Sequence, residues 1–267
     1  MTTLKHWSMS EALQKLQKYK TLIKENWMLW IKSQFEQIDK VTSWVIPWKV
    51  YTIWAYSNSW KSKLSYDYVN HFLAQGKKVN YYSLEVDAWM VLLNLFANKE
   101  KKAFWVNLDS DIYFYKNLKI FDDIYDLEDI LEHIMEDKPE IVFIDFVQNI
   151  QAPWWDYERM TKVAVELQQV AIKSNATIFN LSQVANETAK EIHWNKSPII
   201  SLKWSWALFA SSDIVFILRK LEDWLINLNV AKNKFGRAWD DFVFYADFAT
   251  WQFNLVDSEK LKKWLWQ

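Results

Sequence analysis

The sequence predicts an α/β fold in which a mostly parallel, twisted sheet carries helices on both faces. From Val50 onward, short apolar runs of strand length alternate with helical patterns, which is typical of a parallel sheet with crossover helices. A stretch similar to a phosphate-binding loop, residues 52–62, joins the first apolar run to the first helical pattern. Polar and acidic residues follow several later runs, at the edge of a parallel sheet where ligands bind.

The composition is unusual in its glycine and tryptophan content. The 267 residues include 19 Trp and only 2 Gly, whereas average usage of about 7% would give roughly 19 glycines. Tryptophan also stands where glycine usually does, as in Pro47-Trp48 before a strand and Trp154-Trp155 in a loop. We hypothesise that a reassigned stop codon, meant as glycine, is written as tryptophan at many of these positions. The alternative is a genuinely Trp-rich protein, although Trp cannot replace glycine at tight turns.

Several classes of protein are excluded by the composition. The absence of cysteine excludes a disulfide framework and a cysteine zinc site, and the four histidines are scattered without metal-ligand spacing. No apolar run reaches the ~18 residues that would span a bilayer, and the N-terminus lacks a secretory signal, so we expect a cytoplasmic protein. With a net charge of −1, contact with nucleic acid would have to be local.

The chain divides into a short N-terminal segment, residues 1–30, and one domain, residues 31–267. Within the first, a capping box at residues 8–11 precedes apolar residues at helical spacing, which predicts an amphipathic linker helix to about residue 26. Its single apolar stripe must dock on its own core or on a neighbouring subunit. Residues 27–49 are interpreted as linker and turns.

The order of elements follows from the alternating patterns. Strands are predicted at residues 50–54, 79–84, 118–121, 141–144, 177–181, 214–218, 225–231, 242–245 and 252–255. Helices are predicted at residues 61–74, 88–97, 126–136 and 157–174. Gly76 is the expected C-cap of the first of these helices.

The stretch after the first strand is interpreted as a phosphate-binding loop. That loop has glycine, four free positions, glycine, Lys and Ser/Thr, because its backbone N–H groups wrap a phosphate without side chains in the way. Trp60 fills the second glycine position, so the literal sequence predicts a lost nucleotide site. With Trp60 taken as glycine, the residues expected to bind phosphate are Ala55, Tyr56, Ser57, Asn58, Ser59, Trp60, Lys61 and Ser62.

Three polar residues at later strand ends complete a set for phosphoryl transfer to water. Glu85, Asp145 and Gln183 each have an ordinary structural interpretation, as solvated caps or local hydrogen-bond partners. Their joint occurrence indicates ATP hydrolysis with Mg²⁺. Lys61 would neutralise the β- and γ-phosphates, and Ser62 and Asp145 would hold Mg²⁺. Glu85 would be the base for the attacking water and Gln183 the γ-phosphate sensor.

The motifs resemble the RecA-like ATPase domain of DnaB-type replicative helicases (superfamily 4), over nearly everything from about residue 30 onward. Ser83-Leu84-Glu85 resembles the family's Ser-Leu-Glu, whose Glu is the catalytic base. The segment 144–148 resembles its Walker B motif, and Leu181-Ser182-Gln183 resembles its sensor. The resemblance implies a RecA-like P-loop fold with ATP and Mg²⁺ as cofactors.

Two further segments bear on partners. Lys203-Trp204-Ser205-Trp206 resembles the loop that grips single-stranded DNA in the family's hexamer pore. Residues 231–236 resemble the segment that supplies a trans-acting cationic finger; Lys234 stands where the family has Arg, and Arg237 is the alternative. The resemblance implies a homo-oligomeric ring, a hexamer, on single-stranded DNA. Contact with primase is not expected, because the family's N-terminal domain is absent from the sequence.

The function implied is an ATP-dependent DNA helicase motor that translocates on single-stranded DNA in replication. A RadA-like recombination ATPase is an alternative, since residues 232–236 resemble that family's Lys-Asn-Arg-Phe-Gly. A non-catalytic DNA-binding ring accessory protein is a second alternative, favoured if Trp60 is a true tryptophan.

Overall fold

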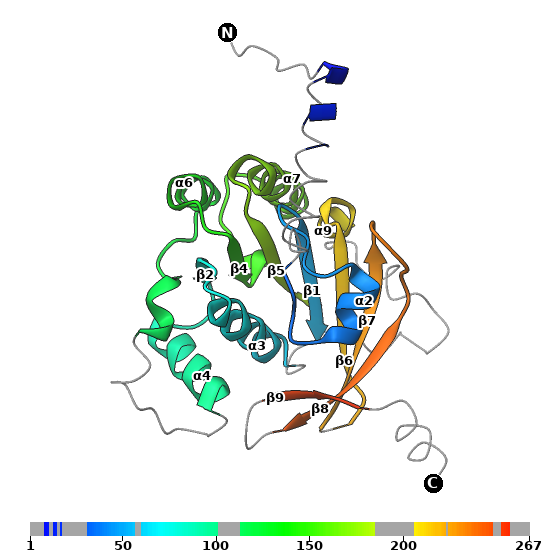
Figure 1. The fold of residues 1–267 in the computed structure, drawn as a ribbon. Coiled ribbons are helices and arrows are strands. Elements are labelled where there is room, and N and C mark those ends of the chain that lie inside the picture. The colour runs from blue at the N-terminus through cyan, green and yellow to red at the C-terminus, as the bar shows by residue number, and fades with distance from the viewer. Residues whose placement is uncertain are drawn as a thin grey trace.

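One nine-stranded sheet forms the centre of the molecule, with strand order β3-β2-β4-β5-β1-β6-β7-β8-β9 (Figure 1). The computed structural model describes residues 8–10, 13–14, 17, 31–56, 60–100, 113–184, 206–222, 224–247 and 252–256. The strands are β1 (Val50–Tyr56), β2 (Val79–Ser83), β3 (Leu118–Phe121), β4 (Ile141–Asp145), β5 (Thr177–Val184), β6 (Ile214–Lys220), β7 (Leu225–Asn233), β8 (Asp241–Asp247) and β9 (Gln252–Leu255).

The sheet has a parallel part and an antiparallel part. The strands from β3 to β6 in the spatial order are parallel, with β1 between β5 and β6. β7, β8 and β9 extend the sheet in antiparallel pairs. The runs Val79–Ser83 and Ile141–Asp145 are buried throughout, as expected of parallel strands covered on both faces.

Helices cover both faces of the sheet (Figure 1). One apolar cluster joins a face of the sheet to α2 (Glu36–Thr42), α3 (Lys61–Ala74) and α4 (Ala88–Glu100). A second cluster joins the other face to α6 (Leu127–Asp137), α7 (Asp156–Ser174) and α9 (Trp206–Ser211). Two short 3₁₀ helices, η1 (Phe114–Asn117) and η2 (Val147–Asn149), complete the described elements. The predicted α/β class, with helices on both faces, is confirmed.

The ends of two helices follow from their sequences. The Asp126 side chain accepts a hydrogen bond from the Glu128 N–H and so caps α6. α3 has the predicted bounds, and Gly76 follows it with φ +74°, where a side chain would be strained. The Gly76 N–H donates to the Leu73 carbonyl at 2.8 Å, which closes the helix as predicted.

Three segments differ from the prediction. Residues 27–49 were expected as linker and turns, but α2 lies within them, held by its buried Ile38 and by the Asp39 carboxylate, which accepts from the Ser33 N–H at 2.9 Å. Six residues, Trp206–Ser211, form α9 rather than part of a loop, and β5 continues to Val184. These elements are stabilised by tertiary packing, which a short segment does not reveal by itself.

The predicted linker helix in residues 1–30 lies mostly outside the described residues, which include only 8–10, 13–14 and 17 of it. Among the helices that the structure does describe, none is long and apolar enough to cross a membrane.

Candidate nucleotide-binding site

The candidate site lies where the parallel strands end and α3 begins. β1 ends at Tyr56 and α3 starts at Lys61; residues 57–59 of the predicted phosphate loop lie outside the described residues. Trp60 occupies the N-cap position of α3 with φ 62° and ψ 20°, a left-handed conformation, and its side chain makes no capping hydrogen bond. The backbone at this position therefore has the geometry that glycine adopts most readily.

The predicted phosphate lysine and both predicted Mg²⁺ ligands come together. Lys61 Nζ lies 2.9 Å from Asp145 Oδ1, with the two side chains only 10% and 5% exposed. The Ser62 hydroxyl donates to Asp145 Oδ2 at 2.6 Å. α3 supplies the lysine and serine and β4 supplies the carboxylate, so the arrangement depends on how the helix packs on the sheet.

Tyr81 is a member of this cluster that the sequence analysis missed. Its buried hydroxyl donates to Asp145 Oδ2 at 3.0 Å and lies 3.1 Å from the Ser65 hydroxyl. Burial raises the pKa of Tyr81 well above its ordinary value, and the negative charge of Asp145 raises it further. Tyr81 therefore stays a neutral donor that holds the carboxylate in place. The available signal was a tyrosine in an otherwise apolar strand, two residues before Ser83.

The cluster fits a phosphate and a divalent cation. Lys61 Nζ and Asp145 Oδ1 are buried, yet neither completes a hydrogen bond of normal geometry within the described residues. An ammonium with free donors suits phosphate oxygens, and a carboxylate beside a serine hydroxyl suits Mg²⁺. Lys61 would hold the phosphates of ATP, and Ser62 and Asp145 would hold Mg²⁺ directly or through water.

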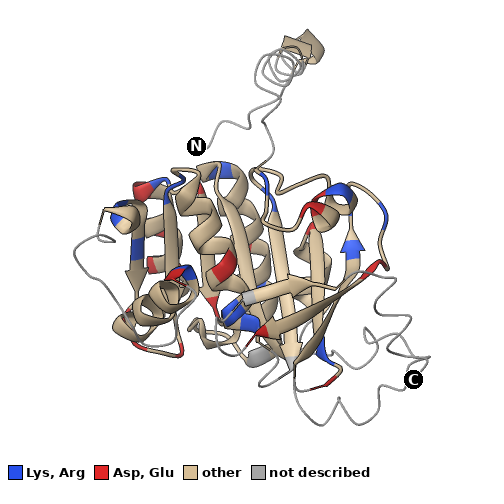
Figure 2. Ribbon diagram, turned by 60° about the horizontal axis from the view of Figure 1, so that its bottom comes forward, with Lys and Arg blue, Asp and Glu red and all other residues tan. Residues whose placement is uncertain are grey.

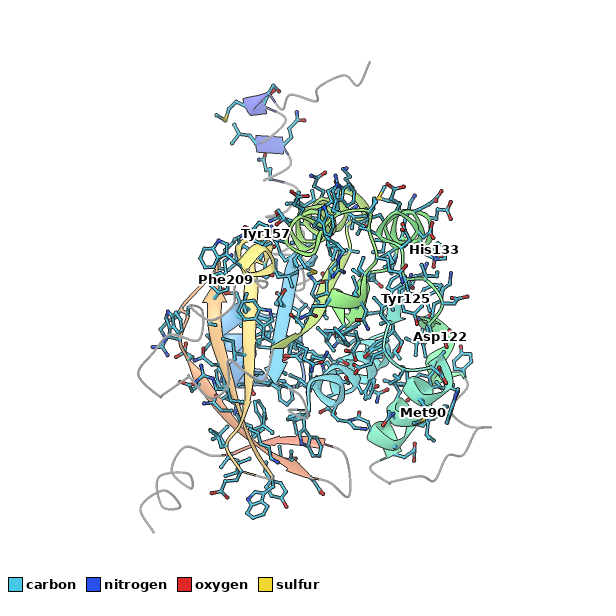
Figure 3. The ribbon with its side chains drawn as sticks, turned by 180° about the vertical axis from the view of Figure 1, so that it is seen from behind. Met90, Asp122, Tyr125, His133, Tyr157 and Phe209 are labelled. Atoms are coloured by element: carbon cyan, nitrogen blue, oxygen red, sulfur yellow. The ribbon has the colours of Figure 1, made fainter. Side chains whose placement is uncertain are left out.

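Glu85 lies at the same edge of the sheet, in the connection between β2 and α4. Ser83 pairs with Asp145, and the Leu84 N–H donates to the Asp145 carbonyl at 2.7 Å. The Asn149 amide donates to the Leu84 carbonyl at 2.7 Å. At the other end of the connection, Asp122, labelled in Figure 3, accepts from the Ala88 N–H at 2.7 Å. The connection is thus fixed at both ends, while Glu85 itself is exposed to solvent.

Gln183 lies beside the phosphate-loop strand, within β5 rather than beyond its end as predicted. It pairs with Ala55 of β1. Gln148, which follows β4, donates from its side-chain amide to the Ser182 hydroxyl at 2.8 Å and to the Gln183 carbonyl at 2.7 Å. Gln148 thereby links the Asp145 segment to the predicted sensor, a connection that sequence reasoning did not assign.

The two candidate finger residues lie at the opposite edge of the sheet. Lys234 Nζ pairs with Asp213 Oδ1 at 3.0 Å, and Asp213 Oδ2 accepts from the N–H of Val50, the first residue of β1. The phosphate loop follows the last residue of β1, on the order of 20 Å away at about 3.3 Å per residue. Arg237 pairs with Asp240 and is 78% exposed. One chain does not bring Lys234 or Arg237 to its own phosphate site.

Of the predicted DNA-binding residues, Lys203, Trp204 and Ser205 lie outside the described residues. Trp206 is half-exposed at the start of α9, the helix that Phe209 marks in Figure 3. Lys232 Nζ donates to the Phe209 and Ala210 carbonyls at 2.5 and 3.0 Å. Burial lowers the pKa of Lys232 to about 8, and the charge of Lys234 adds to this.

Comparison with known structures identifies the fold. The ATPase domain of a DnaB-like helicase superposes with a TM-score of 0.80 at 18% identity, over 95% of this chain and 100% of that one. The chain has the RecA-like fold of a helicase ATPase domain. A structure of a DnaB-like replicative helicase, described with its interactions with primase, matches with a TM-score of 0.75 at 16% identity, over 96% of this chain and 69% of that one. No protein-family model and no curated protein matches the sequence.

Proposed function

We propose that the chain is an ATP hydrolase that drives translocation along single-stranded DNA, as a replicative helicase motor in the cytoplasm. The observation that carries this proposal is the cluster of Lys61, Ser62 and Asp145 at the carboxyl edge of a helicase-type ATPase fold. The cluster supplies a buried cation for phosphates and a carboxylate with a hydroxyl for Mg²⁺.

Each residue has a distinct role in hydrolysis. Bound Mg²⁺ supplies charge neutralisation between the β- and γ-phosphates. Lys61 adds a second positive charge there, and Tyr81 and Ser62 keep the Asp145 carboxylate in its orientation. Glu85, exposed on a fixed connection, accepts a proton from the attacking water. Gln183 responds to loss of the γ-phosphate, and Gln148 transmits this response to the Asp145 segment.

The position of Lys234 and Arg237 supports a ring. They lie at the sheet edge opposite Lys61, so a cationic finger from this turn can reach a phosphate site only on another copy of the chain. We propose a homo-oligomeric ring, a hexamer, in which each site is completed by its neighbour. Single-stranded DNA would contact the segment Lys203, Trp204, Ser205 and Trp206.

The charge distribution is consistent with such a local DNA contact. In Figure 2, acidic and basic residues are interspersed over the described elements, and the net charge of the chain is −1. Binding of DNA would therefore depend on a few phosphate contacts rather than on a basic face. No contact with primase is included in the proposal.

ATP turnover by the intact chain and its Glu85→Gln variant tests the catalytic part. The variant keeps the size of the side chain but cannot accept a proton, so we expect it to bind ATP and not to hydrolyse it. Glu128→Gln, on the exposed surface of α6, is the matched control and should keep full turnover. Full turnover by Glu85→Gln would show that another group is the base.

The two alternatives give different results with DNA. A RadA-like ATPase would pair homologous strands without unwinding a forked duplex, whereas the proposed motor would unwind it. A non-catalytic ring protein would bind DNA with no turnover of ATP at all.

A further inference from the structure

A polar cleft of about 530 Å³ lies between α3, the end of α4, β9 and the segment before α2. None of the residues of the Lys61–Asp145 cluster lines it. Three aromatic rings form part of its wall, those of Phe35, Phe114 and Phe253. The cleft is therefore separate from the candidate nucleotide site, and the inference below does not depend on the proposed ATPase activity.

A hydrogen-bond network leaves one carboxylate oxygen of Asp67 unused in this cleft. The Tyr115 hydroxyl donates to Asn70 Oδ1 at 3.0 Å, and the Asn70 amide donates to Asn98 Oδ1 at 2.8 Å. The Asn98 amide then donates to Asp67 Oδ1 at 2.6 Å. Asp67 Oδ2 is buried and makes no hydrogen bond of normal geometry within the described residues. A buried carboxylate oxygen without a partner is costly and marks a place for a donor.

Burial also changes the protonation of Asp67. It raises the pKa of the carboxyl to about 7, although hydrogen bonds from Asn98 and the Phe253 backbone oppose the change. At neutral pH the group is therefore close to its midpoint, and a cation placed beside it would stabilise the ionised form.

Two further acceptors lie in the same cleft. The His71 ring donates to the Lys32 carbonyl, and its Nε2 is buried without a hydrogen bond to the described residues. Burial lowers the pKa of His71, so the ring is neutral and Nε2 is an acceptor. The Gln34 amide is likewise buried with its oxygen and nitrogen unused in the described part of the chain. His71 follows Asp67 by one turn of α3, so both face the same space.

We propose that this cleft binds a guanidinium group, carried by a small molecule or by an arginine side chain of a partner protein. The planar fork of N–H donors suits the three acceptors Asp67 Oδ2, His71 Nε2 and Gln34 Oε1. The guanidinium plane also stacks on aromatic rings, which the cleft provides. An ammonium group would present fewer donors and no flat face to these rings.

Lys99 is the one charged group in the cleft that opposes a cation. Its Nζ lies 3.5 Å from a Glu100 carboxylate oxygen and 4.7 Å from the centre of the Phe114 ring. Glu100 offsets its charge, and the contact with Phe114 holds it against the wall. The acceptors of Asp67, His71 and Gln34 remain for the ligand.

Isothermal titration calorimetry with methylguanidinium and with N-acetylarginine amide tests the proposal. We expect saturable binding to the intact chain and at least about tenfold weaker binding to Asp67→Asn. Asp129→Asn makes the same change on the exposed surface of α6 and should bind as the intact chain does. Circular dichroism would confirm that Asp67→Asn is folded, which we expect because the change removes a buried acid.

The two probes separate the sources of the group. Similar affinity for both indicates a small guanidinium ligand, and about tenfold tighter binding of the arginine amide indicates a protein side chain. Affinity should rise from about pH 6 to about pH 8 in the intact chain as Asp67 ionises, and should stay flat in Asp67→Asn. Failure of both probes to bind, or equal binding to Asp67→Asn, would overturn the proposal and leave the ATPase proposal untouched.

Discussion

At the residue scale, the Asp145 carboxylate is the centre of the candidate site. Oδ2 accepts from Ser62 and from Tyr81, and Oδ1 faces Lys61. Ser62 and Lys61 belong to the recognisable phosphate-loop pattern, but Tyr81 does not. Its hydroxyl is the part of this arrangement that can be removed while the other groups stay in place.

Tyr81→Phe should therefore weaken the use of Mg²⁺ without removing the site. A hydrogen bond to a charged group contributes about 1.5 to 3 kcal/mol, so we expect the Mg²⁺ concentration for half-maximal ATP turnover to rise roughly tenfold. Turnover at saturating Mg²⁺ should fall much less. Tyr82→Phe is the control, since Tyr82 is equally buried but packs in the cluster on the other face. An unchanged Mg²⁺ requirement in Tyr81→Phe would contradict this role.

Trp60 tests the hypothesis that tryptophan stands for glycine. Four of the seven non-glycine residues with positive φ are tryptophans, namely Trp44, Trp48, Trp60 and Trp239. A side chain costs roughly 1 to 2 kcal/mol in this conformation, which supports the hypothesis. We expect Trp60→Gly to bind ATP more tightly than the chain as written, measured by fluorescence anisotropy of a labelled nucleotide. Trp89→Gly, inside α4, should leave binding unchanged and lower stability by about 1 kcal/mol. Unchanged or weaker ATP binding by Trp60→Gly would favour a true tryptophan.

Asp67 predicts a pH dependence of stability. The folded state keeps the Asp67 proton up to about pH 7, since burial raises the pKa of this group to about 7. The unfolded chain loses it near the ordinary value, so between these values folding binds a proton and stability falls as pH rises. Asp67→Asn should lack this fall and be more stable by about 2 to 4 kcal/mol at about pH 8, from urea unfolding curves. Parallel pH profiles for the two proteins would contradict the assignment.

At the element scale, the turn between β7 and β8 is held on α2. The Asn233 amide donates to the Val41 carbonyl at 2.9 Å, and a Cβ on Gly236 would lie 2.7 Å from the same oxygen. Only glycine fits this approach. The turn therefore presents Lys234 and Arg237 from a fixed position at the edge of the sheet opposite the phosphate loop.

Mixing two inactive variants tests whether the turn acts on a neighbouring copy. Lys234→Ala should lose most ATP turnover but keep nucleotide binding and nearly all stability, because its partly exposed ion pair contributes little. A mixture with Lys61→Ala should recover turnover at interfaces where an intact turn meets an intact phosphate loop. Lys40→Ala, another surface lysine in an ion pair, is the control and should be active alone. A mixture that remains inactive while Arg237→Ala also loses turnover would assign the finger to Arg237.

Much of the element order could be predicted from the sequence. The bounds of α3, β3 and β9 agree with the prediction, because strong apolar patterns and Gly76 mark them. α2 could not be predicted, since it is stabilised by Asp39 bonding to Ser33 and by packing rather than by a long apolar stripe. For the site, Lys61, Ser62 and Asp145 were predictable from motif spacing. Tyr81 and Gln148 act through contacts between strands that no local pattern reports.

At the scale of the whole molecule, the parallel part of the sheet gathers the chemistry at one edge. β1, β2, β4 and β5 bring the phosphate loop, Glu85, Asp145 and Gln183 to that edge, although they are far apart in the sequence. The antiparallel strands carry the candidate finger to the other edge. This polarity suits an assembly in which one copy completes the site of the next.

The rate of ATP hydrolysis with and without single-stranded DNA tests the central proposal most directly. Protein with glycine at position 60 should hydrolyse ATP slowly alone and several-fold faster with single-stranded DNA, and Glu85→Gln should abolish both rates. Hydrolysis that is identical with and without DNA would contradict the coupling of ATP turnover to movement on single-stranded DNA.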